Sequence, residues 1–219
     1  MKMENELKAA ILLILVSFAV GAYAYGLLPA QVASHWGISG EPNGYMPAIF
    51  GAFFLPGLMA VLFAIFIAIP KIDPLRANTE AFKTEYYRFV LVILSFMFLI
   101  YAQSILWNLG TEISFNLTMP VLLGCLFFYV GILLEKAKRN WFIGIRTPWT
   151  LSSDEVWVKT HKLGSKLFKA VGVASVVSVL LPAYALVIVI GLIVGAAVAL
   201  VVYSYMVYTK LKKTVKKSK

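Results

Sequence analysis

The stretch SKLFKAVGVASVVSVLLPAYALVIVIGLIVGAAVALVVYSYMVY, residues 165–208, is a nearly unbroken apolar run of 44 residues. The hydrocarbon core of a membrane is about 30 Å thick and needs roughly 20 apolar residues per helix, so the run is too long for one span and suits two. Pro182 lies near its middle, and proline both lacks a backbone donor and clashes with the preceding turn of a helix. We therefore predict two membrane helices joined by a tight hairpin at LLPAYA.

The rest of the chain has the same character, since 61% of its 219 residues are hydrophobic and only 14% are charged. Backbone polar groups in lipid must pair internally, so such runs should be helices. The sequence predicts an all-α, polytopic membrane protein. Its six transmembrane helices are expected at residues 8–27, 47–69, 87–107, 116–134, 165–181 and 183–208.

Lysine and arginine placement predicts the orientation, because cytoplasmic loops are enriched in these residues. With both termini in the cytoplasm, all 20 basic residues lie inside or at inner helix ends. The two outer segments, 28–46 and 108–115, carry only Glu41 and Glu112. The net charge of +10 is therefore interpreted as a topology signal, with membrane lipids as partners and no direct nucleic-acid binding.

The predicted spans contain no ionisable residue near their middle. Ion-coupled transporters usually place such groups at mid-membrane, and intramembrane metalloproteases need a motif such as HExxH, which is absent. The two histidines, His35 and His161, are expected on opposite sides of the membrane. We therefore expect no catalytic residues, no metal site and no cofactor.

The outer loop LLPAQVASHWGISGEPNGYMP holds the first candidate site. Pro29 and Gly37 suit the start and the end of a short helix, so His35 and Trp36 are expected to end a small interfacial helix. Two interpretations are open for this loop. Its aromatic residues either anchor at the lipid headgroups or form a rigid lid that presents a ligand-facing or toxin-facing set. That set is His35, Trp36, Glu41, Asn43 and Tyr45.

Polar side chains gather near the outer end of the third predicted span: Tyr101, Gln103, Ser104, Trp107 and Asn108. Interhelical hydrogen bonds and an interfacial aromatic belt are one interpretation. The other is the wall of an outward-facing pocket formed by Tyr101, Gln103, Trp107 and Asn108. In the sixth span, Gly191 and Gly195 form a GxxxG pair that would allow close helix approach.

The inner loop NWFIGIRTPWTLSSDEVWVKTH, residues 140–161, interrupts the apolar pattern. Ser152 and Glu155 predict a capping box that begins an amphipathic helix. This helix is expected to lie at the headgroup layer and to lead into the fifth span, with Trp157 buried in the interface. Arg146, in a proline-braced turn, is expected either to pair with Asp154 or Glu155 or to bind a phosphate or a partner.

Two motifs carry a resemblance to a known family. In the outer loop, Leu28, Pro29, His35, Trp36, Gly40 and Pro42 to Tyr45 resemble the signature of a small membrane domain of unknown function that occurs at the N-terminus of SdpI-family proteins. The inner loop is similar to the SdpI hallmark segment. The matching residues are Asn140, Gly144, Arg146, Thr147, Pro148, Trp149, Thr150, Trp157, Thr160, His161 and Gly164.

This resemblance implies two domains. An N-terminal two-helix domain would span residues 1–75 with its extracellular loop at 28–46. A four-helix SdpI-like domain would span 76–219 with its cytoplasmic loop at 135–164. In that loop, the resemblance marks Asn140, Arg146, Thr147, Trp149, Trp157 and His161 as the motif that would bind a partner or a phosphate.

The resemblance also implies a function: a non-enzymatic immunity protein in the plasma membrane of a prokaryote, which protects its host from a secreted peptide toxin. A linked role would be that of a receptor which recruits a cytoplasmic transcriptional repressor. The alternative class is a small-solute transporter or a lipid-handling protein, which would use the polar cluster of the third span and Arg146.

Overall fold

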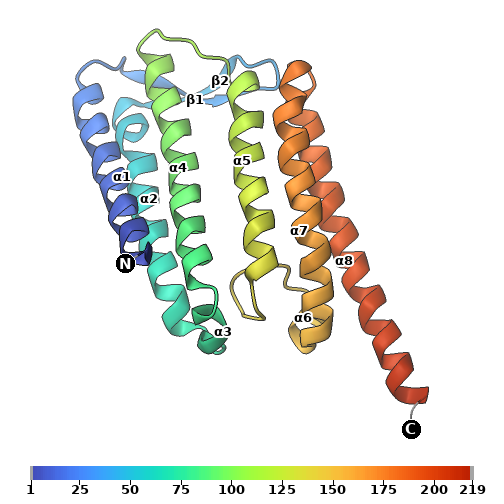
Figure 1. The fold of residues 1–219 in the computed structure, drawn as a ribbon. Coiled ribbons are helices and arrows are strands. Elements are labelled where there is room, and N and C mark those ends of the chain that lie inside the picture. Colours follow the sequence, from blue (N-terminus) through green and yellow to red (C-terminus); the bar gives the residue numbers. More distant parts are fainter. Residues whose placement is uncertain (1, 218–219) are drawn as a thin grey trace.

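The computed structural model describes residues 2–217, and six long helices run side by side through it (Figure 1). Their bounds are α1 Lys2–Tyr25, α2 Ala48–Ile72, α4 Lys83–Asn108, α5 Phe115–Lys136, α7 Asp154–Val177 and α8 Ala185–Lys217. Each contains an apolar stretch long enough to cross a membrane. The predicted all-α, six-helix membrane architecture is confirmed.

Five short elements complete the chain: the strands β1 Gln31–Trp36 and β2 Pro42–Pro47, and the helical turns α3 Arg76–Glu80, α6 Pro148–Ser152 and η1 Ser178–Leu180. The two strands cross one end of the bundle, which we call the hairpin face (Figure 1). The opposite end carries α3, α6 and the ends of α1 and α8 that lead to the chain termini, and we call it the terminal face. The two predicted candidate sites therefore lie at opposite ends of the same bundle.

The long helices pack in two groups, α1 with α2 and α4, and α5 with α7 and α8, and α4 also contacts α5. Glycines allow the closest approaches. A Cβ on Gly124 would lie 2.7 Å from the carbonyl oxygen of Gly172, and one on Gly131 would lie 2.7 Å from the side chain of Lys169. The predicted domain boundary after residue 75 stays a prediction, although α4, which follows it, packs against both helices that precede it.

The predicted GxxxG pair does not contribute to this packing. A Cβ placed on Gly191 or Gly195 would meet no other atom within 4 Å, so this side of α8 faces away from its neighbours within the described chain. The predicted helical hairpin around Pro182 is confirmed. The α7 helix passes through η1 into a turn at residues 181–184, and α8 starts at Ala185.

The predicted amphipathic helix runs into the fifth span as expected, since both segments form the single helix α7 from Asp154 onward. The expectation that its apolar face lies in the headgroup layer is wrong. The α7 helix packs against α5 and α8, so its apolar stripe is covered by protein rather than by lipid. Trp157 and His161 are both buried, with 1% and 2% of their surface exposed. The periodicity of the stripe identified the buried face correctly, but it could not distinguish a lipid contact from a helix contact.

The prediction of a short helix over residues 29–37 is also wrong. Residues 31–36 form β1, which pairs antiparallel with β2, with Val32 opposite Met46 and Ala33 opposite Tyr45. Proline at both ends of β2 and glycine within it disfavour a helix there, and the extended backbone of β2 offers β1 a partner. Gly40, at φ +85°, supplies the left-handed turn conformation between the strands.

Candidate functional site

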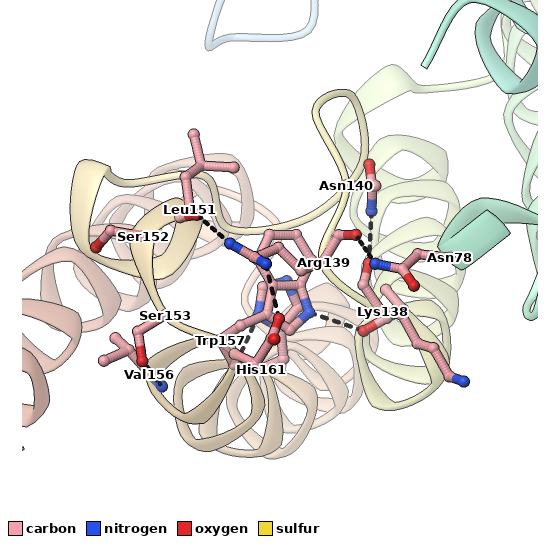
Figure 2. Close-up of polar contacts among 12 residues, drawn as sticks. Asn78, Lys138, Arg139, Asn140, Leu151, Ser152, Ser153, Val156, Trp157 and His161 are labelled. Carbon is pink, nitrogen blue, oxygen red and sulfur yellow. Dashed lines mark hydrogen bonds and ion pairs between the residues drawn. The ribbon is translucent and has the colours of Figure 1, made fainter. Parts of the chain in front are cut away.

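The SdpI-like motif forms an ordered loop between α5 and α7 at the terminal face (Figure 2). We call residues 137–153 the motif loop. It begins directly after α5, contains the short helix α6 and ends at Ser153, which caps α7. The motif residues hold this loop in place through three sets of contacts.

The first set centres on Asn140, which is fully buried. Its amide donates to the carbonyl oxygens of Lys138 and Ile143, both at 2.8 Å. Its side-chain oxygen accepts from the backbone N–H groups of Phe142 at 2.9 Å and Ile143 at 2.6 Å. The side chain thus satisfies both N–H and C=O groups of a tight turn, a role that requires both halves of an amide.

The second set is a layer formed by Trp157, His161 and Gly144. The two rings stack at a centroid distance of 3.9 Å, and the Trp157 indole N–H donates to the carbonyl oxygen of Ala137 at 2.9 Å. The Ile145 N–H donates to Nε2 of His161 at 3.1 Å. Since Nε2 accepts, Nδ1 carries the proton and donates to the Trp157 carbonyl at 2.9 Å. In this arrangement the neutral imidazole has both nitrogens paired, and it ties the loop to α7.

Gly144 fits closely against this layer. Its φ is +117°, and a Cβ there would lie 2.4 Å from Nε2 of His161 and 3.2 Å from the Trp157 ring. Both the backbone conformation and the close approach therefore require glycine.

The third set is a capping box on α6. The Thr147 side chain accepts from the Thr150 N–H at 3.2 Å, and the Thr150 hydroxyl oxygen accepts from the Thr147 N–H at 2.9 Å. Thr147 also contacts Ser204 of α8 at 3.0 Å. The predicted capping box of Ser152 and Glu155 is wrong by one residue, because the cap of α7 is Ser153, whose hydroxyl accepts from Val156. A short helix, α6, already begins at Pro148 and includes Ser152. Ser152 is therefore inside α6 and does not cap α7.

The predicted ion pair of Arg146 is likewise wrong, because another arginine, Arg139, makes it. Arg139 lies 2.7 Å from Asp154 and donates to the Leu151 carbonyl at 2.8 Å. Arg146 is exposed and donates to the Trp141 carbonyl at 2.6 Å. Trp149 packs half-buried against Tyr205 of α8, with ring centroids 5.1 Å apart. Arg146 is thus the exposed charged group of the motif.

The structure adds residues to the site that the sequence prediction missed. Asp73, only 3% exposed, accepts from the Leu75 N–H at 2.7 Å, from the Thr79 hydroxyl at 3.0 Å and from the Trp141 N–H at 3.4 Å. Asn78 donates to the Arg139 carbonyl at 2.8 Å (Figure 2). The α2–α4 connection therefore holds the motif loop from its other side. A signal was present, since Asp73 precedes Pro74 directly after a span, where aspartate favours turns.

At the hairpin face, Trp36 packs at a tilt against Phe115, with centroids 4.1 Å apart, and meets Trp107 edge-on at 5.8 Å. Asn108 pairs with the strand edge, accepting from the Ala33 N–H at 2.7 Å and donating to its carbonyl at 3.0 Å. The hairpin is thus fixed to α4 and α5. Four of its predicted ligand-facing residues remain exposed: His35, which contacts Asn43 through Nδ1, Glu41, Asn43 itself and Tyr45.

The predicted outer-pocket residues have partners within the protein. Tyr101 donates to the Ala52 carbonyl at 2.9 Å. Gln103 donates to the Ile113 carbonyl at 2.9 Å and accepts from Thr118 at 2.7 Å. These are the interhelical contacts that the first interpretation expects, while a ligand pocket at these residues stays a prediction. Within residues 2–217, no group of three or more His, Cys, Asp or Glu side chains is arranged to hold a metal ion.

These features define the class: a six-helix membrane protein whose hairpin and motif loop are fixed at opposite ends of the bundle by buried hydrogen bonds. Residues 136–208 match the family described as "SdpI/YfhL protein family", and residues 12–60 match a "Domain of unknown function (DUF1648)". The chain is 25% identical over 203 residues to "Immunity protein SdpI" of Bacillus subtilis (strain 168), which covers 92% of this chain and 95% of that protein. No solved structure gives a significant match. By these matches, the chain is similar to SdpI-family proteins along most of its length.

Proposed function

We propose that this protein is an integral membrane immunity protein, which protects the cell that carries it against a secreted peptide toxin. The observation that carries the proposal is the alignment with an immunity protein along nearly the whole of both chains. The hairpin and the motif loop, which hold the motif residues, both fall within that alignment. We place the protein in the plasma membrane of a prokaryote with the terminal face in the cytoplasm, because the lysines and arginines gather there.

The hairpin face would meet the toxin. The hairpin, fixed by Asn108 and by the packing of Trp36 on Phe115, leaves His35, Glu41, Asn43 and Tyr45 exposed, and His35 contacts Asn43. A preorganised surface loses little conformational entropy on binding, which favours recognition of a flexible peptide. Tyr45, with 62% of its surface exposed, offers an aromatic contact of the kind that is enriched at binding interfaces.

The motif loop would meet a cytoplasmic partner, for which we propose a transcriptional repressor. Its buried residues hold the loop, whereas Arg146 and Trp141 remain exposed beside each other. An exposed arginine next to an aromatic residue is a common composition of interaction hot spots. We therefore assign partner binding to the surface around Arg146 rather than to Asn140, Thr147 or His161, which support it.

Buried polar groups in the spans favour this proposal over ion-coupled transport. Ser17, Ser175 and Ser204 are fully buried, and each hydroxyl donates to a carbonyl three or four residues earlier in its own helix. These hydroxyls are bound within their helices, and the middle of the predicted spans holds no ionisable side chain of the kind that ion-coupled transporters use. Support for a non-enzymatic role comes from the family relationship.

The proposal is tested by expressing the chain in cells that are sensitive to a toxin of the kind that SdpI-family immunity proteins counter. Survival is measured for the wild type, for the hairpin variant Tyr45→Ala and for an empty vector, at equal amounts of membrane-inserted protein. We expect protection by the wild type and weaker protection by Tyr45→Ala. Survival of the wild type no better than that of the empty vector would refute the immunity role.

A further inference from the structure

One face of α7 carries three lysines and then two valines, in that order from the terminal face towards the hairpin face. The residues are Lys162, Lys166, Lys169, Val173 and Val176. At 100° per residue, these five positions fall within about 80° of the helix circumference. Both valines and the first two lysines are exposed, and the Lys169 side chain is 32% exposed. This face of α7 is therefore basic near the terminal face and apolar beyond it.

The contacts between α5 and α7 fix the direction of this face, because the two helices run antiparallel (Figure 1). A Cβ on Gly131 would lie 2.7 Å from the Lys169 side chain, and one on Gly124 would lie 2.7 Å from the Val176 side chain. From Gly131, α5 continues towards the terminal face and ends at Lys136. The lysines that precede Lys169 are therefore level with the last turn of α5, and the valines lie deeper in the membrane.

A cavity of about 400 Å³ opens between the end of α5 and this face of α7, which is within the size range of ligand sites. The three lysines line it together with Glu135, Ala137 and Ser165. Helical side chains point back towards the N-terminus of their helix, which for α7 is the terminal face. The lysine stems therefore carry their ammonium groups away from the hydrocarbon and towards the cavity.

The charge of the cavity is only partly neutralised by the protein. Lys169 pairs with Glu135, which the Ser165 hydroxyl also contacts at 3.5 Å. Among residues 2–217, Lys162 and Lys166 take part in no ion pair. Positions four apart on a helix are neighbours, so these two like charges repel each other. An anion held between them would replace that repulsion with attraction.

The surface on the hairpin side of the cavity indicates which kind of anion suits it. Val173 and Val176 of α7 are 55% and 42% exposed there, and Phe128 of α5 is 41% exposed. Phe128 lies beside these valines, because a Cβ on Gly172 would meet its Cβ at 2.7 Å. A soluble anion would contact the lysines alone. A molecule with a phosphate and a hydrocarbon chain would use the lysines and this apolar surface together.

We propose that the α5–α7 cavity binds an anionic phospholipid of the leaflet at the terminal face. The lipid phosphate lies between Lys162 and Lys166, and an acyl chain runs along Val173 and Val176 towards the middle of the membrane. Basic pockets between membrane helices on the cytoplasmic side bind such headgroups, and the lysines and arginines gather at this face. The site is independent of the proposed immunity function.

The first test measures binding of phosphatidylglycerol to the purified full-length protein in neutral detergent, with phosphatidylcholine as the probe without net charge. The variant Lys162→Gln/Lys166→Gln removes two charges from the cavity. The matched control, Lys212→Gln/Lys213→Gln, removes two exposed lysines of α8 that do not line it. Each lysine near an anionic lipid contributes about fivefold in affinity, so the cavity variant should bind phosphatidylglycerol about 30-fold more weakly. The control variant should bind it like the wild type.

The second test follows the direction of the acyl chain. Phosphatidylglycerol with a photoreactive diazirine in its chain is bound to the wild type and irradiated, and the labelled peptides are mapped. The label is expected on α7 at residues 170–177 and on α5 around Phe128. Label confined to residues 203–214 of α8, or spread evenly over the spans, would overturn the proposed orientation.

Three outcomes of the first test would overturn the proposal. Equal weakening in both variants would mean that net charge, and not the cavity, attracts the lipid. Displacement of phosphatidylglycerol by millimolar inorganic phosphate or by an acidic peptide would mean a site for soluble anions. Equal binding of phosphatidylcholine would mean that the lysines play no part. All variants are compared at wild-type helical content, measured by circular dichroism, so that a loss of binding does not reflect a loss of fold.

Discussion

Replacing Gly144 with alanine tests whether the motif loop depends on the Trp157–His161 layer. The residue has φ +117°, a conformation that costs an L-residue about 1–3 kcal/mol. The new Cβ would lie 2.4 Å from Nε2 of His161, so the ring must move. Overpacking of this kind costs about 1–3 kcal/mol, and loss of the Ile145 N–H bond to His161 costs about 1 kcal/mol more. The expected destabilisation is therefore about 3–7 kcal/mol.

The assay is unfolding of the purified protein in mixed micelles with increasing denaturing detergent, followed by helical circular dichroism. Gly191→Ala is the matched control, because a Cβ there meets no atom within 4 Å and alanine is the better helix former, so its stability should stay the same or rise by up to about 1 kcal/mol. Hydrogen exchange at the Ile145 amide reports the local effect, since that N–H loses its acceptor only in the Gly144 variant. Equal unfolding curves for Gly144→Ala and Gly191→Ala would mean that the motif loop does not depend on the close fit of Gly144 against His161.

Four further substitutions probe other contacts. Asn140→Ala leaves two N–H groups and two carbonyls of the turn unpaired, so it should cost about 2–4 kcal/mol in the same unfolding assay. A cost below about 1 kcal/mol would contradict the view that this side chain holds the turn. Trp157→Phe keeps the ring stack but removes the bond to Ala137, so it should cost about 1–2 kcal/mol by the same measurement. Asp154→Asn removes the exposed charged partner of Arg139, and because solvent screens exposed ion pairs, it should change stability by less than about 1 kcal/mol. A larger loss would show that solvent does not screen this pair. Asn108→Ala should free β1 from α4 and raise hydrogen exchange at the Ala33 amide, with little effect on exchange at the motif loop.

The sequence predicted the membrane architecture well because the physics of the spans is local. A run such as residues 183–208 needs no partner to be recognised, since its length and hydropathy alone meet the requirement of the bilayer. The helix α8 begins two residues later than predicted, and it extends into the basic tail because lysine and leucine are good helix formers. The buried face of α7 was also predictable from its periodicity, including Trp157, His161 and Gly164.

The errors concern segments whose conformation depends on a partner distant in sequence. Residues 31–36 have no strong strand pattern of their own, and only pairing with residues 42–47 and with Asn108 makes them a strand. Likewise, the choice between Arg139 and Arg146 as partner of Asp154 depends on how Asn140 turns the chain, which spacing alone does not reveal. Asp73 lies 68 residues from Trp141, so its contact with the motif loop could not be inferred from either segment alone.

A killing curve is the decisive test of the proposed immunity role of this chain. Cells expressing the wild-type chain, Gly144→Ala, Gly191→Ala or an empty vector are exposed to increasing toxin, and surviving colonies are counted at matched protein levels. We expect the wild type and Gly191→Ala to shift killing to higher toxin concentrations, while Gly144→Ala loses much of that shift. A wild-type curve that overlaps the empty-vector curve at every concentration would contradict it.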